Sequence, residues 1–329
     1  MPDGAGIMDK TWCDGILNVD KPRGWTSHDV VAKVRGLLNG KKVGHAGTLD
    51  PTATGVLPIL VGRATRIAEY LLEWDKEYRA VLRLGETTDT QDASGVILTR
   101  CTVAGLSEPR IRSVVAQFQG PLSQLPPMYS AIKVGGAPLY KAARSGKTVA
   151  RELRRIMIHH IEVTGTAGRD VALRVVCSKG TYVRTLCADI GNALGVGGHL
   201  YTLERTRVGP LTVSRALTID GLSRQCANGG LAAELISLDE ALSHLPQVVV
   251  AEEAASRLVH GVPVPVGSVQ WGLSSRIEEI KPGGPVRLKN TRGRLLALGR
   301  FPIRHTESAP TGMPAADSAL SISKVLVEE

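Results

Sequence analysis

The chain has 329 residues, of which 43% are hydrophobic and 22% are charged, and this balance indicates an ordered protein and not a disordered one. Forty Lys and Arg against 31 Asp and Glu give a net charge of +9, which favours a polyanionic partner such as nucleic acid. The apolar stretches, such as 55–62, are too short to cross a membrane, and residues 1–10 lack a secretion signal. We therefore expect a cytoplasmic protein without membrane contact.

The residue patterns in the first two thirds of the chain predict helices and strands that alternate irregularly. Gly15–Asp20 is expected to form a buried strand that stops before a proline, because proline cannot continue a central ladder. Thr26 or Ser27 can cap the helix that follows, whereas the stretch 44–62 is too irregular for one regular element. Further helices are expected over 64–72, 107–118 and 182–194, and strands over 77–84 and 171–177.

Alternation is clearest in the predicted strand over 77–84, where Tyr78, Ala80 and Leu82 share one face. The chain shows no repeating strand–helix units of the kind that build a parallel sheet. We therefore predict an α+β fold.

The residue pattern of the sequence changes near Gln247, where short apolar runs broken by Gly and Pro replace helix-forming sequence. This change predicts a large domain over 11–247 and a small β-rich domain over 248–329. Within these limits we expect a disordered N-terminus over 1–10, an inserted loop over 306–317 and a closing strand over 322–327.

Two clusters of basic residues add to the evidence from net charge for a polyanionic partner. Seven Lys and Arg with a single acid lie between Lys133 and Arg155, and seven with no acid lie between Lys281 and Arg304. Two separated clusters suit a long phosphate backbone better than a small ligand. The candidate RNA contacts in them are Lys133, Arg144, Arg154, Lys289 and Arg292.

Motifs for cofactors and metals are missing from the sequence. The five cysteines are widely spaced and include no C-x-x-C pair, which argues against a disulfide framework or a zinc site. There is no P-loop, no dinucleotide fingerprint and no metal-binding histidine pair. We therefore expect neither a cofactor nor a metal.

Two short stretches could carry chemistry. In the loop 44–57, Asp50 precedes Pro51, which biases the aspartate to an extended conformation and holds its carboxylate on a fixed loop. The stretch 178–185 lies at a strand-to-helix junction, where backbone N–H groups and Arg184 could meet an anion. On these residues alone, an ordinary turn aspartate and a solvated surface arginine are the favoured interpretations.

Taken in order, seven stretches resemble the TruB family, the bacterial tRNA pseudouridine 55 synthases. The resemblance is strongest at Gly44–Leu57, and the final 80 or so residues resemble a PUA-type RNA-binding domain more weakly. The seven stretches are Gly15–Ser27, Gly44–Leu57, Asp75–Arg79, Gly85–Asp92, Pro127–Lys133, Ser178–Arg184 and His199–Arg207.

The resemblance implies a pseudouridine synthase fold with a central mixed, largely antiparallel sheet flanked by helices and loops. It implies that Asp50 is the essential carboxylate, that Arg184 pairs with it and that Tyr78 stacks on the target base. Further residues match RNA-binding or base-pocket positions of the family, while the Lys21-Pro22 motif is thought to be mainly structural. These matched residues are His45, Tyr182, Leu203 and Lys21.

The implied activity is isomerisation of uridine 55 in the T-arm loop of tRNA, which needs no cofactor because substrate and product are isomers. A segment over about 124–156 would clamp the T-arm, the C-terminal cluster would hold the acceptor stem, and the chain would act as a monomer without an obligate protein partner. Three alternatives remain open: a non-catalytic tRNA-binding or tRNA-folding protein, a guide-RNA-dependent rRNA pseudouridine synthase, and a hydrolase of the nucleoside bond.

Overall fold

The computed structural model describes residues 14–130, 133–134, 137–138, 145, 149–274, 280–302 and 319–327. The predictions for the N-terminal ten residues, Arg144 and the loop 306–317 lie outside the described residues. Two compact units divide the chain: one comprises Leu17–Ile59 and Leu71–Leu231, and the other comprises Met1–Ile16, Leu60–Tyr70 and Ala232–Glu329. The predicted domain limit near Gln247 stays a prediction.

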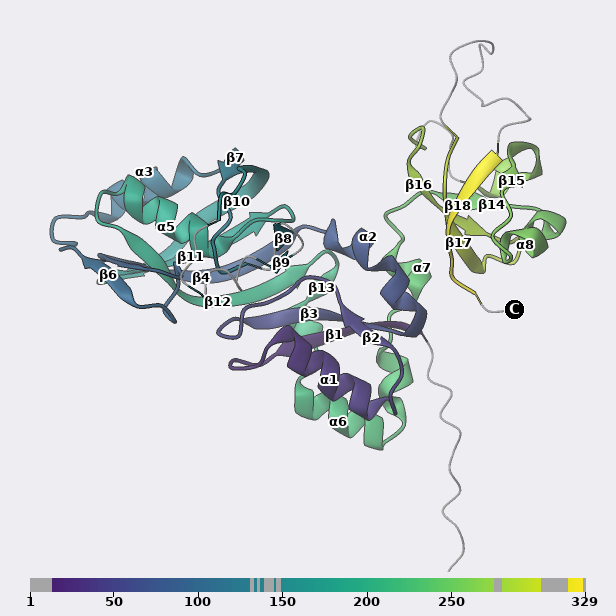
Figure 1. Ribbon diagram of the computed structural model, residues 1–329, viewed down its shortest axis with the longest axis horizontal. Helices are drawn as coiled ribbons and strands as arrows, with labels where there is room; N and C mark the ends of the chain where they lie inside the picture. The colour runs from purple at the N-terminus through teal and green to yellow at the C-terminus, as the bar shows by residue number, and fades with distance from the viewer. Residues whose placement is uncertain are drawn as a thin grey trace, which may run out of the picture. The chain divides into compact units, whose positions relative to one another are not determined.

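A large mixed sheet forms the centre of the fold (Figure 1). In the described part of the chain its order is β1-β3-β12-β4-β11-β10-β7, with β2 beside β3 and β13 beside β12. Only the β12–β3 pair among the printed registers of this sheet is parallel, so the sheet is largely antiparallel. Its strands are β1 (Gly15–Lys21), β2 (Val43–His45), β3 (Thr54–Val61), β4 (Lys76–Leu84), β7 (Gly120–Gln124), β10 (Arg154–Ala167), β11 (Asp170–Cys177), β12 (Gly198–Val208) and β13 (Leu211–Thr212).

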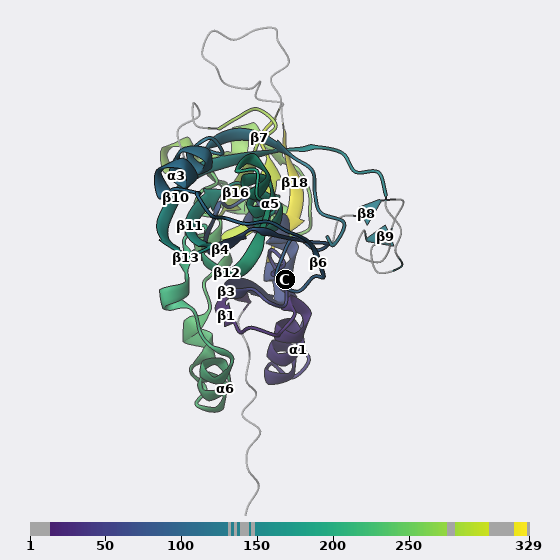
Figure 2. The same ribbon diagram turned by 90° about the vertical axis from the view of Figure 1, so that its left-hand side faces the viewer.

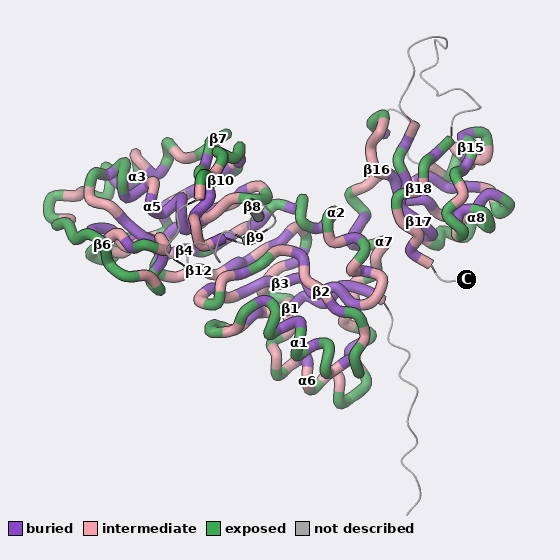
Figure 3. The backbone as a smooth tube through the Cα atoms, viewed as in Figure 1, coloured by how far each residue is buried: buried purple, intermediate pink, exposed green. Residues whose placement is uncertain are grey.

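Helices α3 (Glu108–Ala116) and α5 (Val183–Ala193) cover one face of this sheet. Their apolar side chains share one core with the alternate strand residues Tyr78, Ala80 and Leu82. Figure 3 colours the backbone of these elements by burial. The face predicted for Tyr78 is therefore confirmed, since Arg79 on the opposite face is exposed. The α+β class with a largely antiparallel sheet is confirmed as well.

Helix α1 (Ser27–Leu37) is defined at its start by a capping box. The Thr26 side chain accepts a hydrogen bond from Asp29 N, and the Asp29 carboxylate accepts one from Thr26 N. Thr26 is thus the cap, one of the two residues that the sequence allowed. Helix α6 (Ile219–Ala227) packs against α1, and the two helices lie below the sheet in Figure 2.

Strand β3 was not found from the sequence, because Gly55 and Pro58 both break a strand pattern. Gly55 has φ +99°, and an added Cβ would lie only 2.2 Å from the carbonyl oxygen of Arg205 on β12. Glycine therefore permits the close approach of β3 and β12. Pro58 has no N–H to donate, but its carbonyl accepts a hydrogen bond from Ala46 N at 3.0 Å. The strand therefore continues through the proline.

Shorter elements occur in both units. The predicted helix over 64–72 is a 3₁₀ turn, η1 (Gly62–Ile67), followed by α2 (Ala68–Leu72). The other short elements are the hairpins β5 (Glu86–Thr88) with β6 (Ile97–Arg100) and β8 (Lys133–Val134) with β9 (Ala137–Pro138), the 3₁₀ turns η2 (Val213–Arg215) and η3 (Gly230–Glu234), and helix α7 (Leu238–Ala241).

The C-terminal part forms a separate small sheet with its own apolar core, which confirms the predicted β-rich character. Its order is β14-β16-β17-β18-β15, and β18 (Ala319–Val325) is the predicted closing strand, shifted toward the N-terminus. A relation to PUA domains stays a prediction. The other elements are β14 (Gln247–Val249), α8 (Glu252–Leu258), β15 (Val264–Pro265), η4 (Val266–Ser268), η5 (Trp271–Leu273), β16 (Pro285–Lys289) and β17 (Leu295–Arg300).

The substitution Gly55→Ala tests the close approach of β3 and β12. A methyl group that meets the Arg205 backbone, at a positive φ, should destabilise the protein by about 3 kcal/mol in urea unfolding. The matched control is Gly36→Ala on α1, where an added Cβ meets nothing within 4 Å and should stabilise by about 0.5–1 kcal/mol. Equal effects of the two substitutions would contradict this account.

Candidate active site

Asp50 lies on the loop between β2 and β3, which the turn from β1 to α1 holds in place. The carbonyl of Pro51 accepts hydrogen bonds from Gly24 N at 2.8 Å and from Lys21 Nζ at 3.4 Å. The hydroxyl of Ser27 accepts from Leu49 N at 2.9 Å. An irregular loop inside a fold needs such partners for its polar backbone groups, and these contacts fix the position of the Asp50 carboxylate.

Arg184 reaches this carboxylate from the first turn of α5, 134 residues further along the chain. Its Nε lies 3.0 Å from Asp50 Oδ2 and its Nη2 lies 3.3 Å from Asp50 Oδ1. This is a two-pronged ion pair of the kind that fits a guanidinium to a carboxylate. Only 6% of the Arg184 side chain is exposed, against 38% for Asp50, so the pair opens on the aspartate side.

The electrostatic balance at Asp50 has three main contributions. Burial raises the pKa of Asp50 because it disfavours the charged form, and the nearby Arg184 opposes that rise. A second carboxylate, Asp92, adds to the rise in the pKa of Asp50 because it is a nearby negative charge. Its Oδ2 lies 3.9 Å from Nη1 of the same guanidinium. The carbonyl of Thr90 accepts a further bond from Arg184 Nη1 at 3.4 Å.

Tyr78 faces the same core from β4 and is almost fully buried. Burial raises the pKa of its phenol, which keeps the group neutral. Its register partner on β12 is Arg205, whose guanidinium lies beside the phenol. Tyr78 and Asp50 thus lie close enough for the charge of Asp50 to raise the pKa of the phenol.

Arg205 was not singled out from the sequence, although it is among the largest fully buried side chains. Its guanidinium donates to the carbonyls of Val56 at 2.7 Å, Gly47 at 2.9 Å and Thr48 at 3.4 Å. These carbonyls flank Asp50 on both sides. No ion pair joins Arg205 to a carboxylate within the described ranges. Its neighbours Glu204, Thr206 and Arg207 are polar or charged, so the sequence holds no signal of its burial.

Lys21 and His45 are buried or half-buried next to the Asp50 loop. The Lys21 ammonium is fully enclosed and donates to the carbonyls of Pro22 at 3.0 Å and Trp25 at 2.7 Å, so it acts on protein backbone. Burial lowers the pKa of Lys21 to about 8. Burial also lowers the pKa of His45 to about 4, which keeps the imidazole neutral, and its Nδ1 has no hydrogen-bond partner among the described residues.

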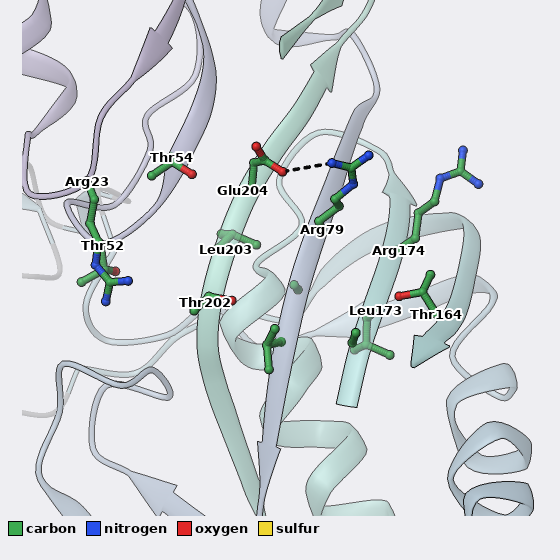
Figure 4. A pocket seen from close by; sticks show the side chains of 13 residues that line it. Arg23, Thr52, Thr54, Arg79, Thr164, Leu173, Arg174, Thr202, Leu203 and Glu204 are labelled. Atoms are coloured by element: carbon green, nitrogen blue, oxygen red, sulfur yellow. Dashed lines mark ion pairs between the residues drawn. The ribbon is translucent and has the colours of Figure 1, made fainter. Parts of the chain in front are cut away.

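Leu203 and Tyr182 both lie near the Asp50–Arg184 pair. Leu203 lines a small pocket together with Asp50 and Asp92, and it also lines a neighbouring hollow of about 490 Å³. Arg79 in that hollow is bound to Glu204 at 3.5 Å (Figure 4). Tyr182 is the last residue before α5, two positions before Arg184.

The predicted RNA contacts in the basic clusters have different environments. Arg154 at the start of β10 and Arg292 after β16 are exposed. Lys289 instead forms an ion pair with Asp239 at 2.6 Å, with 12% of its side chain exposed, so its charge is used within the protein. Lys133 lies in β8, and nothing further is described of its side chain. Arg144 lies outside the described residues.

The described residues contain neither a cluster of metal ligands nor a long apolar helix. No group of His, Cys, Asp or Glu there could hold a metal ion. No helix there is long and apolar enough to cross a membrane.

A loop aspartate paired with an arginine beside a buried tyrosine, on a mixed sheet, characterises this site. Solved structures at 30% identity or more share the fold: a Cbf5-Nop10-Gar1 complex at 32% identity and TM-score 0.73, over 95% of this chain and 85% of that one. An H/ACA RNP bound to a substrate RNA containing 2′-deoxyuridine follows at 30% identity and TM-score 0.72, over 95% of this chain and 85% of that one. Fold and site define the class of pseudouridine synthases.

The chain belongs to the TruB family of pseudouridylate synthases, as predicted, and is an isomerase. The N-terminal domain model of that family matches residues 35–183, and the C-terminal domain model of tRNA pseudouridylate synthase B matches 184–249. The tRNA pseudouridine synthase B of Stutzerimonas stutzeri is 43% identical over 87% of this chain and 90% of its own length. That of Symbiobacterium thermophilum is 48% identical over 76% and 82%.

The substitution Arg205→Met tests whether this buried guanidinium holds the Asp50 loop. Because it removes the donor from the buried carbonyl of Val56 and the part-buried carbonyls of Gly47 and Thr48, and leaves an unmatched space in the core, we expect a loss of about 3 kcal/mol in urea unfolding. Arg205→Lys keeps the positive charge but lacks the forked set of N–H donors, so it should recover only part of the lost stability. The control Arg79→Met, at a side chain 72% exposed, should change stability by less than about 1 kcal/mol. A stable Arg205→Met protein would contradict this role.

Proposed function

We propose that this chain is a tRNA pseudouridine synthase that isomerises uridine 55 in the T-arm loop. The observation that carries the proposal is the two-pronged ion pair between Asp50 and Arg184, found in a chain of the TruB family. The curated relatives are named for this activity on tRNA, and the chain spans 90% of the length of one of them.

In the reaction, the bond between ribose C1′ and uracil N1 breaks, the base turns, and C1′ bonds to C5. The C5 proton then leaves to solvent and N1 gains a proton, so atoms balance without a redox partner. Asp50 acts either by attack on the substrate or by removal of the C2′ proton, which gives a glycal-like intermediate. Both routes need the ionised carboxylate, and Arg184 favours that form against the effect of burial.

The target uridine must leave its stack to reach Asp50, because the reacting atoms of a base stacked in a folded loop are out of reach. Unstacking costs a few kcal/mol, and contact with an aromatic side chain offsets part of that cost. Tyr78 and Leu203 are the proposed walls of the base pocket. The neutral phenol of Tyr78 can serve in a late proton transfer only as a donor.

Binding of the tRNA body is assigned to groups around this pocket. His45, Tyr182 and Arg154 lie nearest the T-arm in this proposal, with Lys133 and Arg144 on the clamping segment 124–156. In this proposal the exposed Arg292 binds the acceptor stem, whereas Lys289 forms an ion pair with Asp239. We expect a monomer that works in the cytoplasm, where its substrate is.

The alternatives are weaker on these observations. A guide-RNA enzyme is favoured by the Cbf5 fold likeness, but identity to those structures is 30–32%, against 43–48% to the tRNA enzymes. A non-catalytic RNA-binding protein has no need of the Asp50–Arg184 pair. A hydrolase would release free uracil, which the assay below would detect.

Tritium release from tRNA carrying [5-³H]uridine tests the activity. The native protein should release tritium, and Asp50→Asn should lower the rate by at least about 10⁴-fold while tRNA affinity is kept. The exposed Asp220→Asn on α6 serves as the control and should keep the native rate. Binding of tRNA without release by the native protein would refute the enzyme and leave the binding protein.

The pH profile tests the electrostatic balance at Asp50. The single-turnover rate should fall with decreasing pH as Asp50 gains a proton, at a pH above that of an ordinary aspartate, because burial raises its pKa. Asp92→Asn removes a charge that adds to this rise, so the acid limb should move to lower pH. Asp220→Asn should leave it in place. A shift of the Asp92→Asn limb to higher pH would contradict the balance.

A further inference from the structure

Gln124 occupies a buried position at the end of β7, with 4% of its surface exposed. Its register partner on β10 is Arg154, and beyond this pair the chain leaves the sheet and returns at 154. A glutamine at such a position must find partners for both ends of its amide, since an unpaired buried amide costs about 1–3 kcal/mol. Those partners identify what the residue does.

Both partners belong to one residue of the candidate active site. Gln124 Oε1 accepts from Tyr182 N at 2.8 Å, and Gln124 Nε2 donates to Tyr182 O at 3.1 Å. The side-chain amide thus pairs with Tyr182 as a neighbouring strand would. Tyr182 precedes α5 and has no side-chain cap of its own, so its N–H is held by Gln124, while its carbonyl accepts both from Gln124 and from Leu186 N at 3.0 Å within the helix.

Arg184 projects from that same start, as the second residue of α5. A guanidinium at the end of a helical side chain follows any rotation of the first turn. A second contact comes from the same stretch of chain as Gln124, because the carbonyl of Tyr129 accepts from Arg184 Nη2 at 2.9 Å. The backbone of Tyr182, two residues before Arg184, and the Arg184 guanidinium are thus both held by residues 124–129.

We infer that Gln124 is a positioning residue for catalysis, which sets Arg184 against Asp50 by pairing with the Tyr182 backbone. This inference rests on the proposed function. Gln124 touches neither Asp50 nor the reacting atoms, and acts only through Tyr182 and Arg184. A displacement of about 1 Å at a catalytic group can cost about 100-fold in rate, so the loss of two hydrogen bonds at this distance from the chemistry has a measurable effect.

The experiment compares single-turnover tritium release at saturating tRNA with the dissociation constant for tRNA, in the full chain. Gln124→Met keeps the volume and loses both hydrogen bonds, so the rate should fall by about 10–100-fold while the dissociation constant changes by less than about threefold. Gln119→Met, at an exposed glutamine five positions upstream, is the matched control and should keep both values.

A second variant, Gln124→Glu, keeps the inference testable if Gln124→Met fails to fold. Its carboxylate can still accept from Tyr182 N but repels the Tyr182 carbonyl, whereas the protonated acid can donate to that carbonyl. The ratio of variant to native rate should therefore rise by at least about threefold as pH falls from about 8 to about 5.5. The charged and titratable groups around this position are Arg154 on β10, the phenol of Tyr182, and Arg184 with Asp50.

The outcomes separate this inference from the proposed function. An active native protein with a native rate in Gln124→Met overturns the inference alone. A loss in Gln124→Met that more tRNA restores shows a binding effect and overturns it too. A ratio of Gln124→Glu rate to native rate that does not change with pH also overturns the inference. An inactive native protein refutes the proposed function instead.

Discussion

A fully buried guanidinium that serves backbone carbonyls, and not a carboxylate, is the constraint on which the site depends. The loop that carries Asp50 is irregular and lies inside the fold, so its carbonyls cannot all be satisfied by a sheet ladder. Arg205 supplies donors to carbonyls on both sides of Asp50 from the centre of β12. The cost of burying its charge is thereby offset by hydrogen bonds, and the loop gains a single geometry.

The two arginines of the site divide the work between structure and charge. Arg205 touches backbone and leaves the carboxylate open, while Arg184 meets the carboxylate directly and is itself shared with Asp92 and with the carbonyls of Thr90 and Tyr129. Because several acceptors hold Arg184, its guanidinium keeps its place when a substrate approaches Asp50. A carboxylate that faces a preorganised cation needs no rearrangement at the moment of reaction.

Local patterns in the sequence limited the helix cap to Thr26 or Ser27 and correctly predicted the face of Tyr78. They were not enough for β3, where Gly55 and Pro58 are explained only by contacts with β12 and with Ala46. The Asp50–Arg184 pair spans 134 residues, so only the family resemblance could propose it. Lys289 shows the opposite limit, since a basic cluster in sequence does not reveal which of its cations turns inward to Asp239.

The inward cations also change what the net charge of the chain means. Among the described residues, five cationic side chains are buried: Lys21, Lys76, Arg184, Arg205 and Arg287. Cations that contact protein oxygens have no access to phosphates and release no counterions when nucleic acid binds. The salt sensitivity of RNA binding therefore follows the exposed arginines and lysines alone, and a net charge of +9 overstates how strongly the surface attracts RNA of any sequence.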